Sequence, residues 1–342
     1  MKALIKPGCG PGLELRDVAI PEPGPGEVRI AVRQAAICGT DLHIEAWDEW
    51  AVANVTPGVT VGHEFVGVVD AIAPDVRGIE IGDRVAGEGH VVCGTCRNCR
   101  AGDGHNCRNV VSVGIQRDGG FADYVVIPAG NAYVIADHVP DDIAAILDPL
   151  GNAVHTALSF DLVGEDVLIT GAGPIGQMAA AIARHAGARH VVVTDLSPTR
   201  LETARQMGAS AAVMPGGDAL RAVMADLGMQ EGFDVALEMS GAGPALADIV
   251  EHVNNGAKIA LLGLFAEAPV VDVNQVILKG LTVKGIYGRE MFDTWYKAVA
   301  MLGSGLDVSP VISHRFTLDD HVAAFAALRS GEASKVILEI DS

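Results

Sequence analysis

The stretch "DVLITGAGPIG" at residues 166–176 decides the fold of the second half of the chain. A short run of strand-forming residues leads into a turn that carries Gly171, Gly173 and Gly176 in the pattern G-x-G-x-x-G. A helix is predicted over 177–187, and the strand "HVVVTD" (190–195) then ends on an acid. A glycine-rich turn between a strand and a helix, followed by an acid at the end of the next strand, is typical of a dinucleotide-binding unit.

The acid at the end of that second strand predicts which dinucleotide binds. A carboxylate at this place hydrogen-bonds both ribose hydroxyls of the adenosine and repels a 2′-phosphate, so Asp195 favours NAD over NADP. Arg200 could stack on the adenine or grip a phosphate, which would offset Asp195. We weigh the acid more heavily because it occupies the strand end itself. The remaining alternative is a glycine turn in an α/β sheet that binds no ligand.

Strands and helices continue to alternate after this unit, which predicts a parallel, doubly wound sheet. The predicted helices cover 199–209, about 218–228 and about 244–255, and the predicted strands cover 211–215, 233–241, 257–264 and 281–288. Ligands of such sheets bind at the carboxyl ends of the strands. Two strand-end loops should therefore face the nicotinamide: Leu262, Gly263 and Leu264 in one, Ile286 and Tyr287 in the other.

Four of the six cysteines lie close together in "CGTCRNCRAGDGHNC" (93–107). Their spacing is C-x2-C-x2-C-x7-C, and the ligands are Cys93, Cys96, Cys99 and Cys107. Four thiolates complete a tetrahedral zinc shell that has no vacant position, so the cluster predicts a structural zinc that does not catalyse. An iron–sulfur cluster is the competing chemistry. Four unrelated free thiols are the other alternative.

A second group of residues could hold a catalytic metal. Cys38 lies in "AAICGTDLH" (35–43), and "TVGHEFVGVV" (60–69) supplies His63 and Glu64 just before a predicted strand. Catalytic zinc needs three protein ligands and one exchangeable position, and Cys38, His63 and Glu64 or a later carboxylate could supply the three. Taken singly, each is weak evidence, because a lone cysteine or histidine is more often a buried structural residue.

Two polar residues that follow Cys38 could handle a proton. The pKa of histidine lies nearest to neutral pH, so His43 suits accepting a proton and passing it to solvent. The hydroxyl of Thr40 could bridge between a metal-bound group and that base. The alternative is that Thr40 and Asp41 only cap a short helix that begins near Leu42, and both interpretations can hold together.

Composition limits the classes of partner. The chain has 342 residues, and Asp and Glu exceed Lys and Arg by 43 to 24, which gives a formal net charge of −19. Such a surface repels nucleic acid and anionic membranes. The start of the chain is broken by Lys6, Pro7 and Gly8, and no apolar run approaches a membrane span. A cytoplasmic protein is therefore expected, in which clustered thiols stay reduced.

The order of the elements predicts two domains. After a predicted helix over 288–305 the pattern changes, and a terminal strand is predicted over 334–340. We infer that the end of the chain returns to the first domain. The catalytic domain then comprises 1–150 and 290–342, with a zinc lobe at about 90–110, and the dinucleotide-binding domain comprises 151–289.

Taken together, the chain resembles the zinc-dependent medium-chain alcohol dehydrogenases over its whole length. The resemblance implies an α/β fold with a GroES-like β-barrel catalytic domain and a Rossmann domain. It also implies two zinc ions per subunit, one structural and one catalytic, with the catalytic ion on Cys38, His63 and Glu64. Thr40 and His43 would form a proton relay. The NAD contacts that the resemblance implies are Ile175, Asp195, Arg200, Leu262, Gly263, Leu264, Ile286 and Tyr287.

Within the family, the closest likeness is to members that oxidise L-threonine at its β-carbon to L-2-amino-3-oxobutanoate. The stretches that carry it are "AICGTDLHIEAWDEW" (36–50), "GEGHVVCGTCRNCR" (87–100), "DPLGNAVHTALSFDLVGEDVL" (148–168) and "GIYGREMFDTWYK" (285–297). Many relatives carry a glutamate where this chain has Asp148, so we assign Asp148 a catalytic role near the metal instead of a ligand role. Tetramers are common in the family, and a homotetramer is expected.

Two other functions stay open at this point. The first is another zinc-dependent secondary alcohol or polyol dehydrogenase, which would share every metal and cofactor residue. The second is an interaction or nucleic-acid module built on the cysteine lobe, with a vestigial dehydrogenase attached. The acidic composition and the second set of metal ligands both argue against that module.

Overall fold

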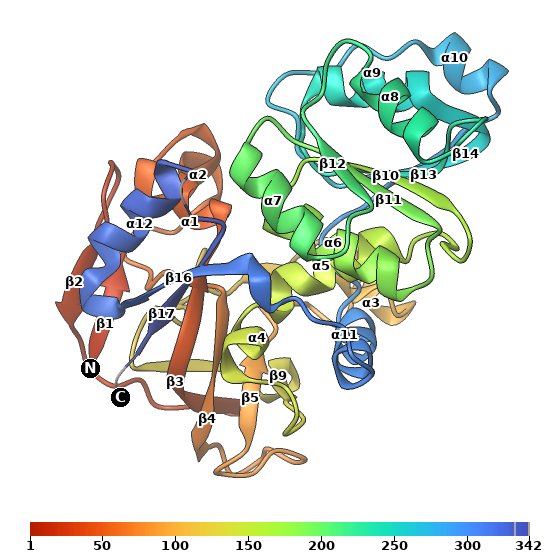
Figure 1. Ribbon diagram of the computed structural model, residues 1–342. Helices are drawn as coiled ribbons and strands as arrows, with labels where there is room; N and C mark the ends of the chain where they lie inside the picture. Colours follow the sequence, from red (N-terminus) through yellow and green to blue (C-terminus); the bar gives the residue numbers. More distant parts are fainter. Residues whose placement is uncertain (332, 341–342) are drawn as a thin grey trace. The chain divides into compact units, whose positions relative to one another are not determined.

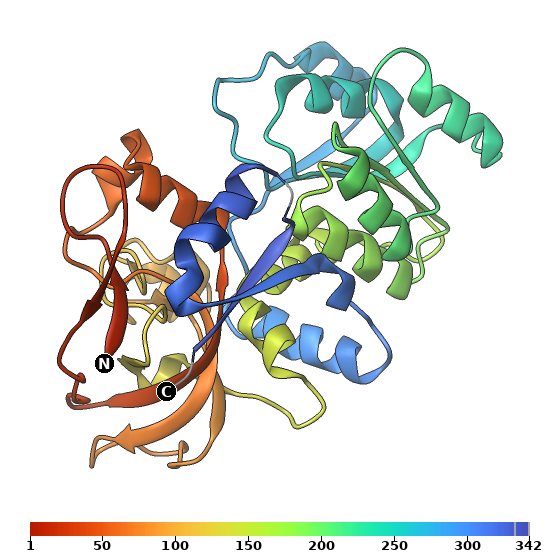
Figure 2. The same ribbon diagram turned by 60° about the vertical axis from the view of Figure 1, so that its left-hand side comes forward.

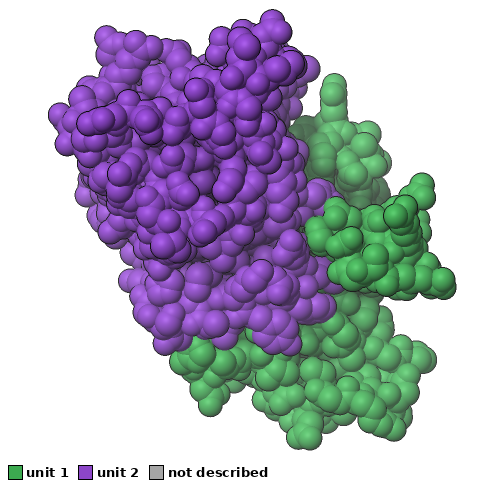
Figure 3. All heavy atoms as spheres, turned by 90° about the vertical axis from the view of Figure 1, so that its right-hand side faces the viewer, with its two compact units in different colours: residues 1–148, 312–342 green, residues 149–311 purple. Residues whose placement is uncertain are grey.

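The computed structural model describes residues 1–331 and 333–340. They form two compact units, which Figure 3 colours separately: unit 1 comprises residues 1–148 and 312–342, and unit 2 comprises residues 149–311. The predicted domains have their second boundary at 289/290, whereas the units divide at 311/312. None of the helices in the described part of the chain is long and apolar enough to span a bilayer.

Unit 2 contains a six-stranded sheet in the order β12-β11-β10-β13-β14-β15, and every neighbouring pair is parallel. All five residues of β10, the stretch "DVLIT", are buried, as expected for a strand covered on both faces. The parallel, doubly wound sheet predicted from the alternating pattern is therefore confirmed. The strands are β10 (Asp166–Thr170), β11 (His190–Thr194), β12 (Ala211–Val213), β13 (Phe233–Glu238), β14 (Val253–Leu261) and β15 (Thr282–Gly285).

The crossover helices of unit 2 alternate with these strands along the chain, and Figure 1 labels them. The first one starts at Pro174, three residues earlier than predicted, because proline at the first helical position has the backbone angle that a helix requires. Gly173 is its N-cap. The helices are α6 (Pro174–His185), α7 (Pro198–Gln206), α8 (Ala219–Asp226), α9 (Gly243–His252) and α10 (Val273–Leu278).

Helix α11 (Asp293–Gly303) explains why the second boundary differs from the prediction. Trp295 on this helix is buried, and the guanidinium of Arg289 lies 5.7 Å from the centre of its ring. The indole also lies against Gly151 of α5 (Leu147–Ala157), where a Cβ would come within 2.9 Å of the indole nitrogen. Helix α11 thus packs on elements of unit 2, although its sequence alone does not say so.

Unit 1 is built around a seven-stranded sheet in the order β16-β17-β3-β4-β5-β9, with β8 also paired to β3. Strand β3 is the longest, and β17 from the end of the chain pairs with it antiparallel (Figures 1 and 2). The strands are β3 (Glu27–Ile37), β4 (Glu64–Ile72), β5 (Arg84–Gly87), β8 (Tyr124–Pro128), β9 (Ala132–Val134), β16 (Ile312–Thr317) and β17 (Lys335–Glu339).

Smaller elements complete unit 1. Two short helices, α1 and α2, follow β3, and a lobe carrying the four clustered cysteines lies between β5 and β8. These elements are β1 (Lys2–Ile5), β2 (Glu14–Asp17), α1 (Gly39–Ala46), α2 (Glu49–Asn54), β6 (His90–Val91), α3 (Arg97–Arg100), β7 (Val111–Ser112), α4 (Asp141–Ala145) and α12 (His321–Arg329). One apolar cluster, which includes Ile30, Phe65 and Leu338, joins the sheet to these elements.

Candidate active site and metal centres

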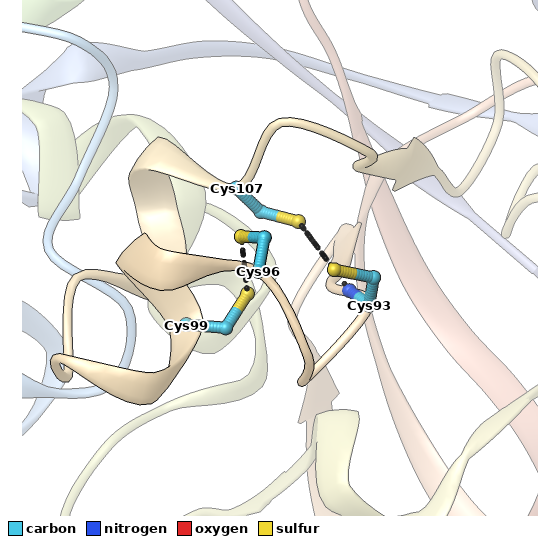
Figure 4. A group of neighbouring side chains, drawn as sticks. All are labelled: Cys93, Cys96, Cys99 and Cys107. Carbon is cyan, nitrogen blue, oxygen red and sulfur yellow. Dashed lines mark hydrogen bonds between the residues drawn. The ribbon is translucent and has the colours of Figure 1, made fainter.

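The four clustered cysteines point toward one another (Figure 4). The sulfurs of Cys96 and Cys99 lie 3.4 Å apart and those of Cys93 and Cys107 lie 3.6 Å apart. All four are free thiols. A tetrahedral site with zinc–sulfur bonds of about 2.3 Å requires sulfur–sulfur distances of about 3.8 Å, so the donor set fits a zinc ion with little adjustment.

The surroundings of the lobe favour thiolates, which are the ligand form of cysteine. Hydrogen bonds from the backbone and side chain of Thr95 lower the pKa of Cys93 to about 5. The backbone N–H of Cys99 lowers the pKa of Cys96. Burial and the neighbouring thiols raise the pKa of Cys99 to about 12. Without a metal the cluster therefore keeps a thiol proton that metal binding would release.

The second group is formed where β3 and β4 meet. The strands are antiparallel and Ala36 pairs with Glu64, so the end of β3 brings Cys38 to the start of β4, where His63 and Glu64 lie. One donor atom from each of these three residues lies within 4.8 Å of the others. A thiolate, an imidazole and a carboxylate are ligands that zinc accepts, and three of them leave a tetrahedral ion one exchangeable position.

Asp41 supports two of these three residues. It is fully buried, and one carboxylate oxygen accepts the backbone N–H of Cys38 at 2.8 Å while the other lies 3.6 Å from Nδ1 of His63. Burial opposes protonation, but Asp41 and Cys38 outweigh it and raise the pKa of His63 well above its usual value. Helix α1 begins at Gly39, earlier than the predicted Leu42, because Asp41 acts as the third-residue partner of a capping box.

Glu64 has a partner that sequence reasoning missed. The ammonium of Lys335, on β17, lies 2.7 and 2.9 Å from the two carboxylate oxygens of Glu64 and 3.2 Å from the carbonyl oxygen of Ile37. Burial alone would lower the pKa of Lys335, but the charge of Glu64 outweighs it and raises that pKa. The only signal in the sequence is a lysine within the apolar strand "SKVILEI", which calls for a buried acidic partner.

Asp148, at the start of α5, lies near this group. Burial raises the pKa of the Glu64 carboxyl, and the negative charge of Asp148 adds to that rise, against the influence of Lys335. Asp148 does not belong to the set of donor atoms that come within 4.8 Å of one another among the described residues. The catalytic role expected for Asp148 therefore stays a prediction.

Helix α1 carries both predicted relay residues. The hydroxyl of Thr40 lies 3.7 Å from the sulfur of Cys38. His43 follows one turn later on the same face of the helix, and its side chain is 58% exposed. One end of the pair therefore touches a candidate metal ligand, and the other end is open to solvent.

The glycine loop in unit 2 is shaped for a close approach of the backbone. Gly171 has a φ of +94°, and a Cβ on Gly176 would lie 1.9 Å from the carbonyl oxygen of Gly171. The loop borders a cavity of about 660 Å³ that Asp195 and Arg200 also line. Asp195 accepts the backbone N–H of Ala172 at 2.7 Å and that of Ser197 at 2.8 Å, so the predicted ribose-binding acid also braces the loop.

The other predicted cofactor residues lie at the same edge of the sheet. Ile175 is in the first turn of α6. The segment Leu262–Leu264 follows β14 and the pair Ile286 and Tyr287 follows β15, so both lie at carboxyl ends of parallel strands. The backbone N–H of Ile286 donates to the carbonyl oxygen of Leu261 at 2.8 Å, which holds the two loops side by side. Among the described residues, these loops are not part of the lining of the cavity that the glycine loop borders.

A buried glutamate beneath these loops was also missed. Glu238, the last residue of β13, is fully buried and accepts the backbone N–H of Ser240 at 2.9 Å and that of Gly241 at 3.0 Å. A Cβ on Gly263 would lie 2.5 Å from its carboxylate. An acid at the end of the apolar strand "FDVALE" is the signal that could have identified it.

Comparisons with known proteins agree with this geometry. The zinc-binding dehydrogenase family model matches residues 174–304, and the alcohol dehydrogenase GroES-like domain model matches residues 24–137. The latter confirms the GroES-like class predicted for the first domain. Two curated relatives, from Anaeromyxobacter sp. (strain Fw109-5) and Burkholderia mallei (strain SAVP1), are 59% and 60% identical over 99% of both chains, and each is named L-threonine 3-dehydrogenase.

Solved structures of the same kind are also similar. The alcohol dehydrogenase TADH from Thermus sp. ATN1 superposes with a TM-score of 0.90 at 27% identity over the whole of both chains. A zinc-binding dehydrogenase from Sinorhizobium meliloti 1021, solved with NADP bound, has a TM-score of 0.90 at 30% identity over 99% of this chain and 98% of its own. The chain therefore belongs to the zinc-containing medium-chain alcohol dehydrogenase family, in the group of the L-threonine 3-dehydrogenases.

Proposed function

We propose that the chain oxidises L-threonine at its β-carbon to L-2-amino-3-oxobutanoate and reduces NAD. The observation that carries this proposal is the identity of about 60% over the full length with curated L-threonine 3-dehydrogenases. The donor set of Cys38, His63 and Glu64 supports it, because oxidation of an alcohol needs a group that makes the hydroxyl more acidic.

Two zinc ions per subunit are part of the proposal. Cys93, Cys96, Cys99 and Cys107 would hold a structural ion, and Cys38, His63 and Glu64 would hold a catalytic one. The catalytic ion supplies a Lewis acid for the substrate hydroxyl when it is bound. Asp41 and Lys335 orient the ligands, since each contacts at least one of them through a buried charged group.

The protein's own residues then move the proton. The Thr40 hydroxyl, beside Cys38, takes the proton from the substrate hydroxyl and passes its own toward His43. His43 releases the proton to solvent, for which its exposed side chain is suited. Asp148 would act as the acidic group beside the metal site, where its negative charge already acts on Glu64.

The proposed cofactor is NAD, held against the glycine loop, where it supplies the hydride acceptor. Gly171, Gly173 and Gly176 leave room for the pyrophosphate at the N-terminus of α6. Asp195 gives the preference over NADP, because its carboxylate stands at the end of β11 beside the cavity and would repel a 2′-phosphate.

We also propose a cytoplasmic homotetramer. The free thiols suit a reducing compartment. Strand β15 is an edge strand of its sheet, all four of its residues are exposed, and exposed Val270, Ile277 and Leu278 lie on and near α10. An unpaired edge beside apolar side chains is a surface that a second subunit can cover.

A substrate panel tests the proposed function. The zinc-loaded protein is assayed by NADH absorbance with L-threonine, sorbitol and 2,3-butanediol, and each reaction is repeated with NADP. We expect the highest kcat/KM with L-threonine and NAD. Faster oxidation of sorbitol or 2,3-butanediol would favour the alternative, another zinc-dependent secondary alcohol or polyol dehydrogenase. Metal analysis should find two zinc ions per chain.

A further inference from the structure

The exposed relay residue His43 is held by a neighbouring carboxylate. Its Nδ1 lies 2.5 Å from Oδ2 of Asp48, and Oδ1 of Asp48 accepts the backbone N–H of Ala51 at 3.0 Å. We propose that Asp48 is a positioning residue, which fixes the His43 ring through Nδ1 so that Nε2 is the nitrogen that accepts the relayed proton. This inference rests on the proposed function, because it assigns a task within the same relay.

The local fold brings the two side chains together. Helix α1 ends at Ala46, and Trp47 then takes a left-handed conformation with a φ of +56° while its N–H donates to the carbonyl oxygen of His43 at 3.0 Å. This reversal returns the chain to the last turn of α1, where His43 lies. Asp48 then starts α2 as its N-cap. Its carboxylate is thus fixed by its own helix and has one oxygen left for the imidazole.

The chemistry of the contact determines the tautomer of His43. An ionised carboxylate can only accept hydrogen bonds, so Nδ1 must carry the hydrogen. In a neutral imidazole Nε2 is then unprotonated and can accept a proton. The backbone N–H of Ala51 and the imidazole of His43 both lower the pKa of Asp48, which keeps this carboxylate ionised.

The contact between His43 and Asp48 does little to stabilise the fold. The side chains of His43 and Asp48 are 58% and 39% exposed, and exposed ion pairs contribute little to stability. The ring of Trp50 lies 6.0 Å away at an interplanar angle of 52°, which is a loose contact. An exposed imidazole would otherwise rotate, and Thr40 lies on one side of it along the helix. The orientation of the ring is therefore what the carboxylate secures.

Two substitutions of Asp48 separate tautomer control from helix capping. Asparagine and serine are both good N-caps, so Asp48→Asn and Asp48→Ser should keep α2. The amide of asparagine can donate to Nδ1, which would place the hydrogen on Nε2 and block proton acceptance, whereas serine leaves the ring untethered. We expect kcat with L-threonine to fall about 100-fold or more in Asp48→Asn and about tenfold in Asp48→Ser, by analogy with other oriented histidine bases.

Three controls make the test specific. Glu49→Gln removes the same charge at the next, exposed position and should keep kcat within about twofold, as expected for an exposed, screened charge. In a His43→Ala background, Asp48→Asn should cause no further loss. Added imidazole should restore part of the kcat of Asp48→Asn and leave the wild type unchanged. Thermal unfolding of every variant is measured beside the kinetics.

The proposal is overturned if Asp48→Asn is at least as active as Asp48→Ser, or if Asp48→Asn costs as much without His43 as with it. The proposed function is judged separately, by the wild-type protein in the substrate panel. If the wild type prefers a diol, that function fails, and the same variants measured with the diol still decide the role of Asp48.

Discussion

Lys335 and Glu64 form a buried ion pair between the last strand of unit 1 and the start of β4. The ammonium contacts both carboxylate oxygens, and the two side chains are 3% and 0% exposed. The charge of Glu64, a residue proposed as a metal ligand, is thus neutralised by a lysine that lies 271 positions away in the chain.

Removing only one partner of this ion pair should lower the stability of the protein strongly. Lys335→Met leaves the Glu64 carboxylate buried without its cation, so we expect a loss of about 3–5 kcal/mol in the free energy of unfolding. The double variant Glu64→Leu with Lys335→Met should recover much of that loss, because neither charge remains. Urea denaturation of the metal-free proteins measures both. A single variant as stable as the wild type would contradict this expectation.

The two cysteine-containing groups should respond differently to substitution. Cys38→Ser should reduce the zinc content from two ions to one and abolish turnover while the melting temperature changes little. Cys96→Ser should also lose one ion, and it should lower the melting temperature clearly, since binding energy at a closed zinc site is partly folding energy.

Cys9 offers a matched control for both variants, because it is exposed and lies outside both groups. Cys9→Ser should keep two zinc ions, the melting temperature and turnover. Metal analysis and thermal unfolding provide the readouts. A Cys96→Ser protein that melts like the wild type but transfers no hydride would mean that the two sites have been assigned in reverse.

Asp195 should control the choice of cofactor. Asp195→Asn removes the charge that repels a 2′-phosphate, so the preference for NAD over NADP in kcat/KM should fall by about tenfold or more, equivalent to about 1.4 kcal/mol. Affinity for NAD should fall too, because Asp195 braces the glycine loop through Ala172. Asp226→Asn, on the exposed end of α8, should leave the ratio unchanged. An unaltered ratio in Asp195→Asn would remove this residue from cofactor selection.

Asp166 should make unit 2 sensitive to acid. It is buried and accepts hydrogen bonds from Arg189 at 2.8 Å and His190 at 2.9 Å. Burial opposes ionisation, but these partners outweigh it and lower the pKa of Asp166. A carboxyl whose pKa is lower in the folded state stabilises the protein above its unfolded pKa of about 3.9, and this stabilisation is lost as the pH falls through the folded value.

Asp166→Asn should therefore lower the free energy of unfolding at neutral pH by roughly 1–3 kcal/mol. The difference from the wild type should begin to shrink as the pH drops below about 4, where the unfolded chain takes up the proton first, and it should vanish once the folded carboxyl is protonated as well. Glu202→Gln, which removes an exposed pair with Arg205, should change stability by less than about 0.5 kcal/mol. A difference that grows toward acid pH would mean that folding does not lower the pKa of Asp166.

The sequence was most informative where function depends on neighbours in the chain. The glycine loop, the strand that precedes it and Asp195 follow one another within a single supersecondary unit, so their pattern predicts their geometry. The four-cysteine lobe is equally local. Both could be recognised because a short spacing determines which atoms meet.

Contacts between distant segments could not be predicted in this way. Lys335 meets Glu64 only because β17 pairs with β3 and β3 pairs with β4, and a strand pattern does not reveal pairing partners. The sequence predicts α11 as a helix, but its place in unit 2 depends on the packing of Trp295 against Gly151. The contact of Asp48 with His43 depends on the reversal at Trp47, which no pattern in the sequence indicates.

The late position of β17 has a consequence for how the protein is made. Unit 2 is a continuous segment, so it can begin to fold while the ribosome is still translating. Unit 1 is split around it, and the lysine that neutralises Glu64 is translated only after the whole of unit 2. If translation stops before Lys335, unit 2 is complete, whereas unit 1 holds the buried Glu64 carboxylate without its cation.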